Sequence, residues 1–435
     1  MTSALSTTMH LLSSPPSEEP ATDYRTSNWF TNGGVVHTGR DGHSFSIEAT
    51  FTCESEVRVV PGVFDTDNHF LAEYYRGFGR CVAVIDQTVE HHYGEQIRAY
   101  FRDHDVPYAA EPLRAWESDK QPELVDAVLM WMRQQRLARH EPLLIIGGGV
   151  LCDTAGLAAA MHHRRTPYVV IGTTVIAAID AGPSPRTCVN GMGFKNHMGA
   201  YHLPVLTIVD RSFFRTLHPA HVRHGIAEAI KMAVIDDAEL FELLVDHGPQ
   251  LVRTRFATEG FDARLAAVAD DVVFKALRSY MRHEGTNPWE THQARPHAYG
   301  HTWSPGYELH SGLLHGQAVS VGMALGATLA ERRGWIGPEK RSAIHQLISS
   351  CELAVDHPVL DDHELLMEAQ TKMIEKRGGR LWAPLPRGRI GACDYADDVS
   401  SEELRDAVEY HHALCASLPR EGAGVEMYLA DLDLR

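Results

Sequence analysis

Between residues 81 and 210 the sequence alternates short apolar runs with longer stretches of helical periodicity. The apolar runs are CVAVIDQTV, PLLIIGGG, PYVVIGTT and PVLTIVD, and helical stretches such as PELVDAVLMWMRQQRLA and DTAGLAAAMHHRR separate them. Short, continuously apolar runs suit strands that are buried on both faces, and helical crossovers are what join parallel strands. The alternation therefore predicts an α/β domain built on a parallel sheet with helices on both faces.

After about Arg211 the pattern changes to helical periodicity, as in HVRHGIAEAIKMAVIDDAELFELLVDHG and GQAVSVGMALGATLAERRG. A chain of 435 residues also exceeds the usual size of one domain. We predict an α/β domain over residues 45–210 and a mainly α-helical domain over residues 211–435. The alternating segment 45–63 predicts antiparallel strands that lead into the first domain, and the Ser/Pro/Glu-bearing segment 1–44 predicts a flexible leader.

Charge and cysteine content exclude several classes of protein. The formal net charge is −17, and no basic block compensates it, so neither nucleic acid nor an anionic membrane is expected as the main partner. No apolar stretch reaches the roughly 18 residues that a membrane-spanning helix needs. The seven cysteines show no CxxC spacing, which favours neither a disulfide framework nor a cysteine zinc site. We therefore expect a reducing, cytoplasmic location.

Three separated side chains form a combination that suits a divalent metal. Glu228 lies in GIAEAIKMAVI, His301 in AYGHTWSP and His315 in LLHGQAV. Two neutral imidazoles and one carboxylate suit zinc and leave coordination positions open for substrate oxygens. Because the chain has 27 histidines and these three do not form a compact motif, three unrelated polar residues are the alternative interpretation.

A glycine turn, Gly147 to Gly149, follows one apolar run and precedes a helix. Such a turn lets backbone amides approach a pyrophosphate at a helix N-terminus. The GxGxxG spacing is absent, so a purely structural turn is the alternative. Other polar residues, however, lie at strand ends or connections, where ligands collect in open parallel sheets; they are Asp86, Glu117, Lys120, Thr173 and Thr174.

Taken in chain order, GGGVLCD, HRRTPYVVIGTT, FKN, GIAEAIK, GHTWSP and LHG resemble the motifs of the sugar phosphate cyclases, the superfamily of dehydroquinate synthase. The resemblance runs from about Val57 to near the C-terminus. It implies a dinucleotide-binding α/β N-terminal domain and a mainly α-helical C-terminal domain, with NAD, a divalent metal and the substrate in the cleft between them.

The resemblance also implies a role for each matched position. Glu228, His301 and His315 become the ligands of the metal, which is zinc or alternatively cobalt. Arg164 matches a phosphate-binding arginine that a partner subunit contributes, which implies a homodimer. The NAD contacts are matched by Asp86, Glu117, Lys120, Gly148, Gly149, Asp153, Thr173, Thr174, Lys195 and Asn196. The positions near the reacting carbons are matched by Asp180, Lys195, Asn196 and Lys231.

Details of the motifs indicate a branch of the superfamily. Dehydroquinate synthases carry a second histidine four residues after the metal-binding one, where this chain has Pro305. The GHTWSP form resembles cyclases that accept sedoheptulose 7-phosphate. The pair Glu284 and Ala298 resembles desmethyl-4-deoxygadusol synthases, whereas 2-epi-5-epi-valiolone synthases tend to carry Leu and Asp there. A solvated helix-end carboxylate and a small packing residue are the plainer interpretations of this pair.

The implied reaction converts the sugar phosphate to a C7 cyclitol and releases phosphate, with NAD restored at the end. It proceeds by transient oxidation, elimination, reduction and intramolecular aldol closure, so the enzyme is a phosphate-eliminating lyase. Lys231 and Arg186 are expected to stabilise developing negative charge, and Asp180 is expected to position the nicotinamide end of NAD. Glu284 is expected to act as a general base in forming desmethyl-4-deoxygadusol.

Two departures from the family pattern bear on activity. Arg186 stands where these cyclases usually have lysine, in a loop that Pro183 and Pro185 stiffen, and arginine does not replace the compact ammonium of lysine. Gly172 in VIGTT replaces the common proline. These departures leave a non-catalytic homologue that binds NAD or metal as an alternative. Dehydroquinate synthase itself is a further alternative, which Pro305 disfavours.

Overall fold

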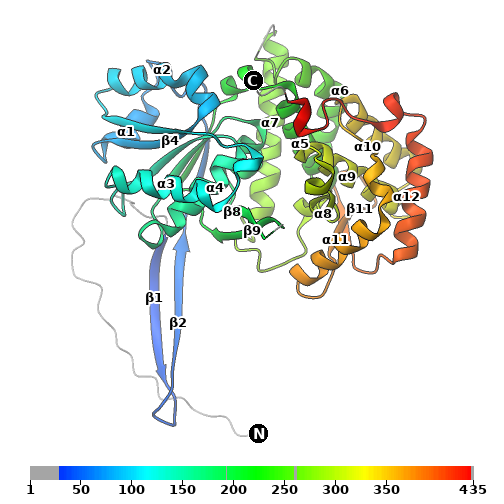
Figure 1. Cartoon of the computed structure of the whole chain (residues 1–435), viewed down its shortest axis with the longest axis horizontal. Coiled ribbons are helices and arrows are strands. Elements are labelled where there is room, and N and C mark those ends of the chain that lie inside the picture. Colours follow the sequence, from blue (N-terminus) through cyan, green and yellow to red (C-terminus); the bar gives the residue numbers. More distant parts are fainter. Residues whose placement is uncertain (1–28, 193, 259–261, 433–435) are drawn as a thin grey trace.

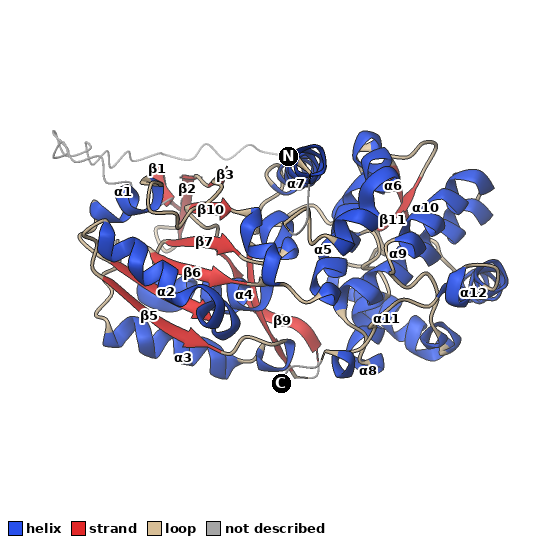
Figure 2. Ribbon diagram, turned by 90° about the horizontal axis from the view of Figure 1, so that it is seen from above, coloured by secondary structure: helices blue, strands red, loops and turns tan. Residues whose placement is uncertain are grey.

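The computed structural model describes residues 29–432 except 193 and 259–261. Its central element is a six-stranded sheet in the order β3-β10-β7-β6-β4-β5, in which every neighbouring pair is parallel (Figure 2). The strands are β3 (Glu56–Val59), β4 (Cys81–Asp86), β5 (Tyr108–Leu113), β6 (Leu143–Gly147), β7 (Tyr168–Gly172) and β10 (Leu206–Val209). The predicted α/β fold class is confirmed.

Helices cover both faces of this sheet because alternate strand residues point to opposite sides. Val84 and Ile145 pack in one cluster with residues of α3 and α4, whereas Ile85 and Ile146 pack in the other with residues of α2 and of the helical half. The helices of this half of the chain are α1 (Phe70–Arg76), α2 (Gln87–Asp103), α3 (Pro122–Gln134) and α4 (Gly149–Met161).

The second half of the chain is a helical assembly beside the sheet (Figure 1). Its helices are α5 (Pro219–Ile235), α6 (Ala238–Arg253), α7 (Ala263–Glu284), α8 (Ser304–Ser311), α9 (His315–Arg332), α10 (Pro338–Ser350), α11 (His363–Lys376) and α12 (Ser401–Cys415). Helices α5 and α9 are buried along almost their whole length and contact each other, and α5 buries the charged residues Glu228 and Lys231 along with its apolar ones. In the described part of the chain, no helix combines the length and apolarity that crossing a bilayer requires.

Three two-stranded sheets complete the described part of the chain, and the sequence predicted none of them fully. β1 (Trp29–Thr38) and β2 (Phe45–Cys53) form an antiparallel ribbon that extends from the body (Figure 1). β8 (Arg186–Gly191) pairs with β9 (Phe194–Tyr201) beside the cleft described below, and β11 (Ala383–Pro386) pairs with β12 (Cys393–Ala396) in the helical half.

The expected boundary of the leader at residue 44 is therefore too late. β1 starts at Trp29, and the segment 45–63 splits between the ribbon and the parallel strand β3 instead of forming antiparallel strands throughout. The physical reason is that Gly33 and Gly34 interrupt the alternation in β1, and its partner lies beyond a turn. The prediction of flexibility for residues 1–28 lies outside the described residues.

Candidate active site

A cleft of about 1050 Å³ runs between the carboxyl edge of the parallel sheet and the helical half. Asp86 ends β4, Gly148 follows β6, and Thr173 follows β7, so three strand ends contribute to its wall. Almost every residue predicted for the site lines it. These are Asp86, Glu117, Lys120, Gly148, Gly149, Asp153, Thr173, Thr174, Asp180, Arg186, Lys195, Asn196, Glu228, Lys231, Ala298, His301 and His315. Two predicted residues, Arg164 and Glu284, are not among the lining residues.

The three candidate metal ligands converge at the helical side of the cleft. Glu228 lies in the middle of α5, His301 follows the short helical turn Pro296–Ala298, and His315 is the first residue of α9. Glu228 Oε1 lies 3.3 Å from His315 Nε2 and 3.8 Å from His301 Nε2. One donor atom from each side chain lies within 4.8 Å of the others. The geometry suits a shared cation.

The protonation of these histidines also suits a metal. Burial lowers the pKa of His301 to about 4, so its imidazole is neutral, and its Nδ1 donates to the Tyr299 carbonyl at 3.1 Å, which leaves the Nε2 lone pair facing Glu228. Burial also opposes the charged form of His315, but Glu308 and Glu228 outweigh it and raise the pKa of His315 to about 9. His315 is therefore protonated near neutral pH when no metal is bound, and this proton supplies part of the positive charge that a metal would supply.

Glu308, which the sequence analysis missed, connects the metal side of the cleft with the predicted NAD side. This buried carboxylate on α8 accepts a hydrogen bond from His315 Nδ1 at 3.0 Å and forms an ion pair with Lys195. Lys195 Nζ lies 3.5 Å from Glu117 Oε1. Burial raises the pKa of Glu308, but Lys195 and His315 outweigh it and hold the pKa well below its usual range. A carboxylate that orients a metal-binding imidazole in this way strengthens the ligand.

Lys231 links the candidate metal ligands to the sheet side of the cleft. Its Nζ lies 2.5 Å from Glu228 Oε2 and 3.1 Å from Asp180 Oδ2. Burial disfavours the ammonium ion, but Asp180 and Glu228 outweigh it and raise the pKa of Lys231. Lys231 is therefore charged and acts as a hydrogen-bond donor rather than as a base.

Arg186 occupies the far side of Asp180 and is held by several protein groups. Its Nη2 lies 3.4 Å from Asp180 Oδ1 and donates to the Tyr280 hydroxyl at 3.0 Å, while Nη1 donates to Glu290 Oε1 at 3.1 Å. Glu284 Oε2 lies 3.4 Å from Nη1. The pKa of Arg186 is raised, because Tyr280 and the surrounding carboxylates outweigh the cost of burial.

Glu284, predicted as a general base, does not line the cleft. Glu284 ends α7 behind Arg186, is 5% exposed, and borders a separate cavity of about 330 Å³ near Pro183 and Pro185. A general base must reach the proton that it removes, and Glu284 contacts Arg186, which lines the cleft, but does not line the cleft itself. Ala298, the other member of the pair, does line the cleft.

The residues predicted to contact NAD form a second polar group on the sheet side. Lys120 Nζ lies 2.5 Å from Asp153 Oδ2 and donates to Asn196 Oδ1 at 2.6 Å. A Cβ atom added at Gly148 would lie 3.0 Å from Thr174 Cγ2, so glycine keeps the wall open there. Gly148 immediately precedes α4, whose N-terminus faces the cleft, as a pyrophosphate site requires.

A basic group at another part of the cleft was also missed. Arg295, Lys376 and Arg377 line the cleft together with Glu290. Burial lowers the pKa of Lys376, and it lowers that of Arg377 to about 10. These residues come from the loop before His301 and from the end of α11, which sequence motifs did not connect.

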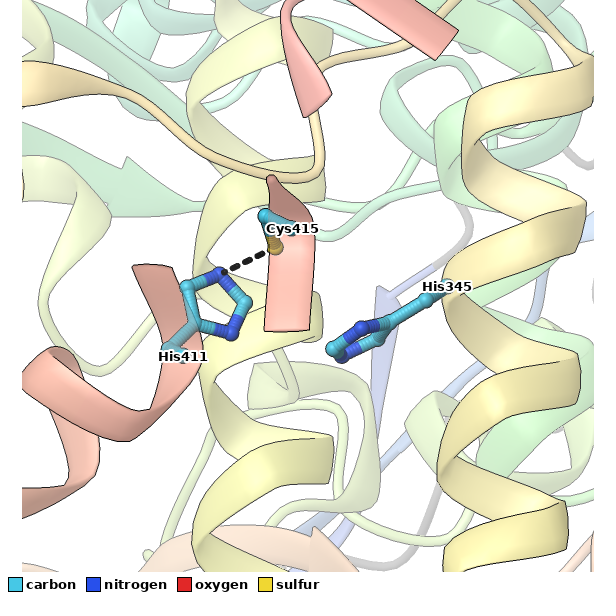
Figure 3. Close-up of side chains that lie close together, drawn as sticks. All are labelled: His345, His411 and Cys415. Carbon is cyan, nitrogen blue, oxygen red and sulfur yellow. Dashed lines mark hydrogen bonds between the residues drawn. The ribbon is translucent and has the colours of Figure 1, made fainter. Parts of the chain in front are cut away.

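A second His/Cys group lies in the core of the helical half. His345 on α10 faces His411 and Cys415 on α12 (Figure 3). His411 Nδ1 accepts from the Thr328 hydroxyl at 2.8 Å, and His411 Nε2 donates to the Val355 carbonyl at 3.0 Å. Both ring nitrogens of His411 are thus satisfied, and burial raises the pKa of the Cys415 thiol to about 12. This group is a hydrogen-bonded part of the core rather than a metal site.

Comparison with known proteins agrees with this fold and site. Residues 112–224 match the family model described as 3-dehydroquinate synthase N-terminal, and residues 225–374 match the model described as 3-dehydroquinate synthase C-terminal. The chain belongs to the 3-dehydroquinate synthase family, in its sugar phosphate cyclase branch. The resemblance inferred from the motifs is confirmed.

The chain is similar to individual proteins of the sugar phosphate cyclase branch. The chain is 38% identical to a demethyl-4-deoxygadusol synthase of Trichormus variabilis over 88% of this chain and 94% of the relative; demethyl and desmethyl name the same compound. It is 37% identical to a 2-epi-5-epi-valiolone synthase of Actinoplanes sp. over 87% and 96%. The solved structure of the 2-epi-5-epi-valiolone synthase ValA of Streptomyces hygroscopicus, with NAD⁺ and Zn²⁺ bound, is 36% identical, covers 84% of this chain and 99% of its own, and has a TM-score of 0.79.

Proposed function

We propose that this protein is an NAD- and zinc-dependent cyclase that converts sedoheptulose 7-phosphate to a C7 cyclitol and releases phosphate, which makes it a carbon-oxygen lyase. The observation that carries the proposal is the convergence of Glu228, His301 and His315 in the same cleft as the glycine turn at Gly148. The NAD⁺ and Zn²⁺ in the similar ValA structure support both cofactors.

The residues present fit both groups. Glu228, His301 and His315 would hold zinc, which acidifies and orients adjacent sugar hydroxyls, while NAD accepts a hydride and later returns it. The ammonium of Lys231, fixed between Glu228 and Asp180, donates hydrogen bonds toward a substrate oxygen on which negative charge develops. Since Lys231 is charged, the proton acceptor for the elimination is another group, and the leaving phosphate itself meets that need.

The phosphate of the substrate fits the basic part of the cleft. Arg295, Lys376 and Arg377 gather there, and burial lowers the pKa of Lys376 and Arg377, so a phosphate beside them would favour their charged forms. Arg164 is exposed and lies outside the cleft of its own chain. We infer that it serves the cleft of a second subunit, so that the working protein is a homodimer.

The product we propose is demethyl-4-deoxygadusol, with a 2-epi-5-epi-valiolone-type product as the alternative. The pair Glu284 and Ala298 supports the first, although Glu284 would act through Arg186 and not as a base in contact with the substrate. The double variant Glu284→Leu/Ala298→Asp should move the product toward the valiolone type. An unchanged product in mass spectrometry would reject this assignment.

Incubation of the purified protein with sedoheptulose 7-phosphate, NAD and zinc tests the main proposal. Inorganic phosphate should be released in step with a new cyclitol detected by mass spectrometry. The matched control is Glu228→Gln, which keeps the shape of the side chain but removes the anionic ligand and should release no phosphate. A wild-type protein that binds zinc and NAD but releases no phosphate would contradict the proposal.

A non-catalytic homologue is the second candidate, because Arg186 and the loop of Pro183 and Pro185 depart from the family pattern. Arg186→Lys separates the two candidates: phosphate release that appears only in this variant would favour the non-catalytic function. Dehydroquinate synthase activity is disfavoured because Pro305 lines the cleft where those enzymes carry a histidine. A cytoplasmic location is also proposed, and the seven cysteines, all free of disulfides, support it.

A further inference from the structure

The carboxylate of Glu290 lies among the cations of the cleft. It accepts hydrogen bonds from Arg186 Nη1 at 3.1 Å and from the Tyr201 hydroxyl at 3.0 Å, and it forms an ion pair with Arg295. Its side chain is 10% exposed, and the residue lines the cleft. Neither the family motifs nor the proposed reaction gives this acidic side chain a role.

Further cationic side chains lie near Glu290. Lys376 and Arg377 line the same part of the cleft, and Glu290 is a carboxylate that favours the charged form of each. Burial nevertheless lowers the pKa of both cations. Glu290 thus contacts two cations directly, Arg186 and Arg295, and stabilises the charged forms of two more, Lys376 and Arg377; of these four, Arg186 is also paired with Asp180 and Glu284. A phosphate dianion carries more charge and more acceptor oxygens than this carboxylate, so it would satisfy the same donors better.

The segment that carries Glu290 is a loop between α7 and the turn at Pro296. Glu290 has a φ of +49°, in the left-handed region that a non-glycine residue adopts only at an energetic cost. The neighbouring Trp289 contacts the Trp29 and Tyr201 rings rather than the body of the core. The backbone at Glu290 is thus held in a left-handed conformation while its side chain contacts Arg186 and Arg295.

We propose that Glu290 is a specificity-determining residue, an internal carboxylate that holds the place of the substrate phosphate and that a phosphate dianion displaces. A neutral sugar or a monoanion does not bring enough charge to displace it, so the cleft selects phosphorylated sugars. This inference rests on the proposed function insofar as it takes the substrate to be a phosphate ester.

Binding of inorganic phosphate to the zinc- and NAD-loaded protein tests the proposal without any turnover. In isothermal titration calorimetry at pH 7.5, Glu290→Gln should bind phosphate about tenfold more tightly than wild type, because a competing unit charge is removed from the cations. Glu290→Asp keeps the charge but reaches its partners less well, so an intermediate gain is expected. Acetate, a monoanion, should bind Glu290→Gln but not wild type.

The matched control is Glu403→Gln, which removes a carboxylate bound by Arg333 outside the cleft and should leave phosphate affinity unchanged. Equal or weaker phosphate binding by Glu290→Gln, with an unchanged circular dichroism spectrum, would overturn the proposal and make Glu290 a fixed structural contact. If Glu290→Gln is unstable, Glu290→Asp decides in the same way. The role of Glu290 and the proposed cyclase activity can fail separately. A protein without cyclase activity can still bind phosphate more tightly after Glu290→Gln, and an active cyclase can lack this increase in phosphate affinity.

Discussion

Zinc binding at Glu228, His301 and His315 should release one proton near neutral pH, and His315 is its source. The pKa of His315 is about 9, so the metal-free imidazole is protonated at pH 7, whereas the pKa of His301, about 4, makes that imidazole neutral already. A proton on Nε2 must leave before zinc binds there. Because the pKa is raised, the protonated form dominates below about pH 9, and competition with zinc grows as the pH falls.

The magnitude follows from the two pKa values. Each pH unit below 9 should weaken apparent zinc affinity about tenfold, so that binding at pH 7 is about 100-fold weaker than at pH 9. Isothermal titration calorimetry in two buffers with different protonation enthalpies at pH 7.5 should give about one proton released for each zinc bound. Zinc binding without proton release, together with an affinity that does not change between pH 6.5 and 8.5, would refute this account of the site.

Glu308→Gln sharpens the test, because Glu308 is the main group that raises the pKa of His315. In this variant, proton release at pH 7.5 should fall, and zinc affinity at pH 8.5 should drop about 10-fold to 100-fold because the imidazole loses the carboxylate that orients it. Glu331→Gln is the control. It removes a carboxylate that forms an ion pair with Arg341, at 2.7 Å from Arg341 Nε, and that does not line the cleft. It should leave both quantities at the wild-type value.

Two further variants probe the rest of the molecule. Gly148→Ala should weaken NAD binding about tenfold, because the added Cβ would lie 3.0 Å from Thr174 Cγ2 at the N-terminus of α4. Fluorescence titration measures the NAD affinity. An unchanged affinity would mean that the turn does not contact the dinucleotide. Thr328→Val should lower the free energy of unfolding by about 1–3 kcal/mol in denaturant titration, because His411 Nδ1 loses its hydrogen-bond donor. The zinc content should not change. Loss of a second bound metal would contradict the assignment of His345, His411 and Cys415 to the core.

The parallel sheet was predictable because each of its parts has a local pattern. Strands such as β6 and β7 are continuously apolar, and the helices between them have their own period. The ribbon of β1 and β2 and the hairpin of β8 and β9 were not, since they depend on pairing between segments whose alternation glycine and proline interrupt. Arg186 shows the consequence: the sequence places it in a loop, whereas the structure places it at the start of β8.

Site residues that belong to a sequence motif could be predicted, whereas residues that only the fold brings to the site could not. The positions of Glu228, His301 and His315 came from motifs, and the structure brings the three side chains together. Glu308 has no motif of its own, because its contact with His315 depends on how α8 turns into α9. The position of Glu284 was unpredictable for the same reason: it does not line the cleft and contacts Arg186, which does, and the sequence does not reveal this arrangement.

The charges around the candidate metal ligands explain why a divalent cation suits this site better than the proton does. The connected group contains six carboxylates, two ammonium groups, two guanidinium groups and one imidazolium; these are Glu117, Asp180, Glu228, Glu284, Glu290, Glu308, Lys195, Lys231, Arg186, Arg295 and His315. Without metal, this group carries one net negative charge. Zinc adds two positive charges and expels one proton, so the group becomes neutral. Since an uncompensated charge in a buried site is costly, the same carboxylates that raise the pKa of His315 also favour the dication that replaces its proton.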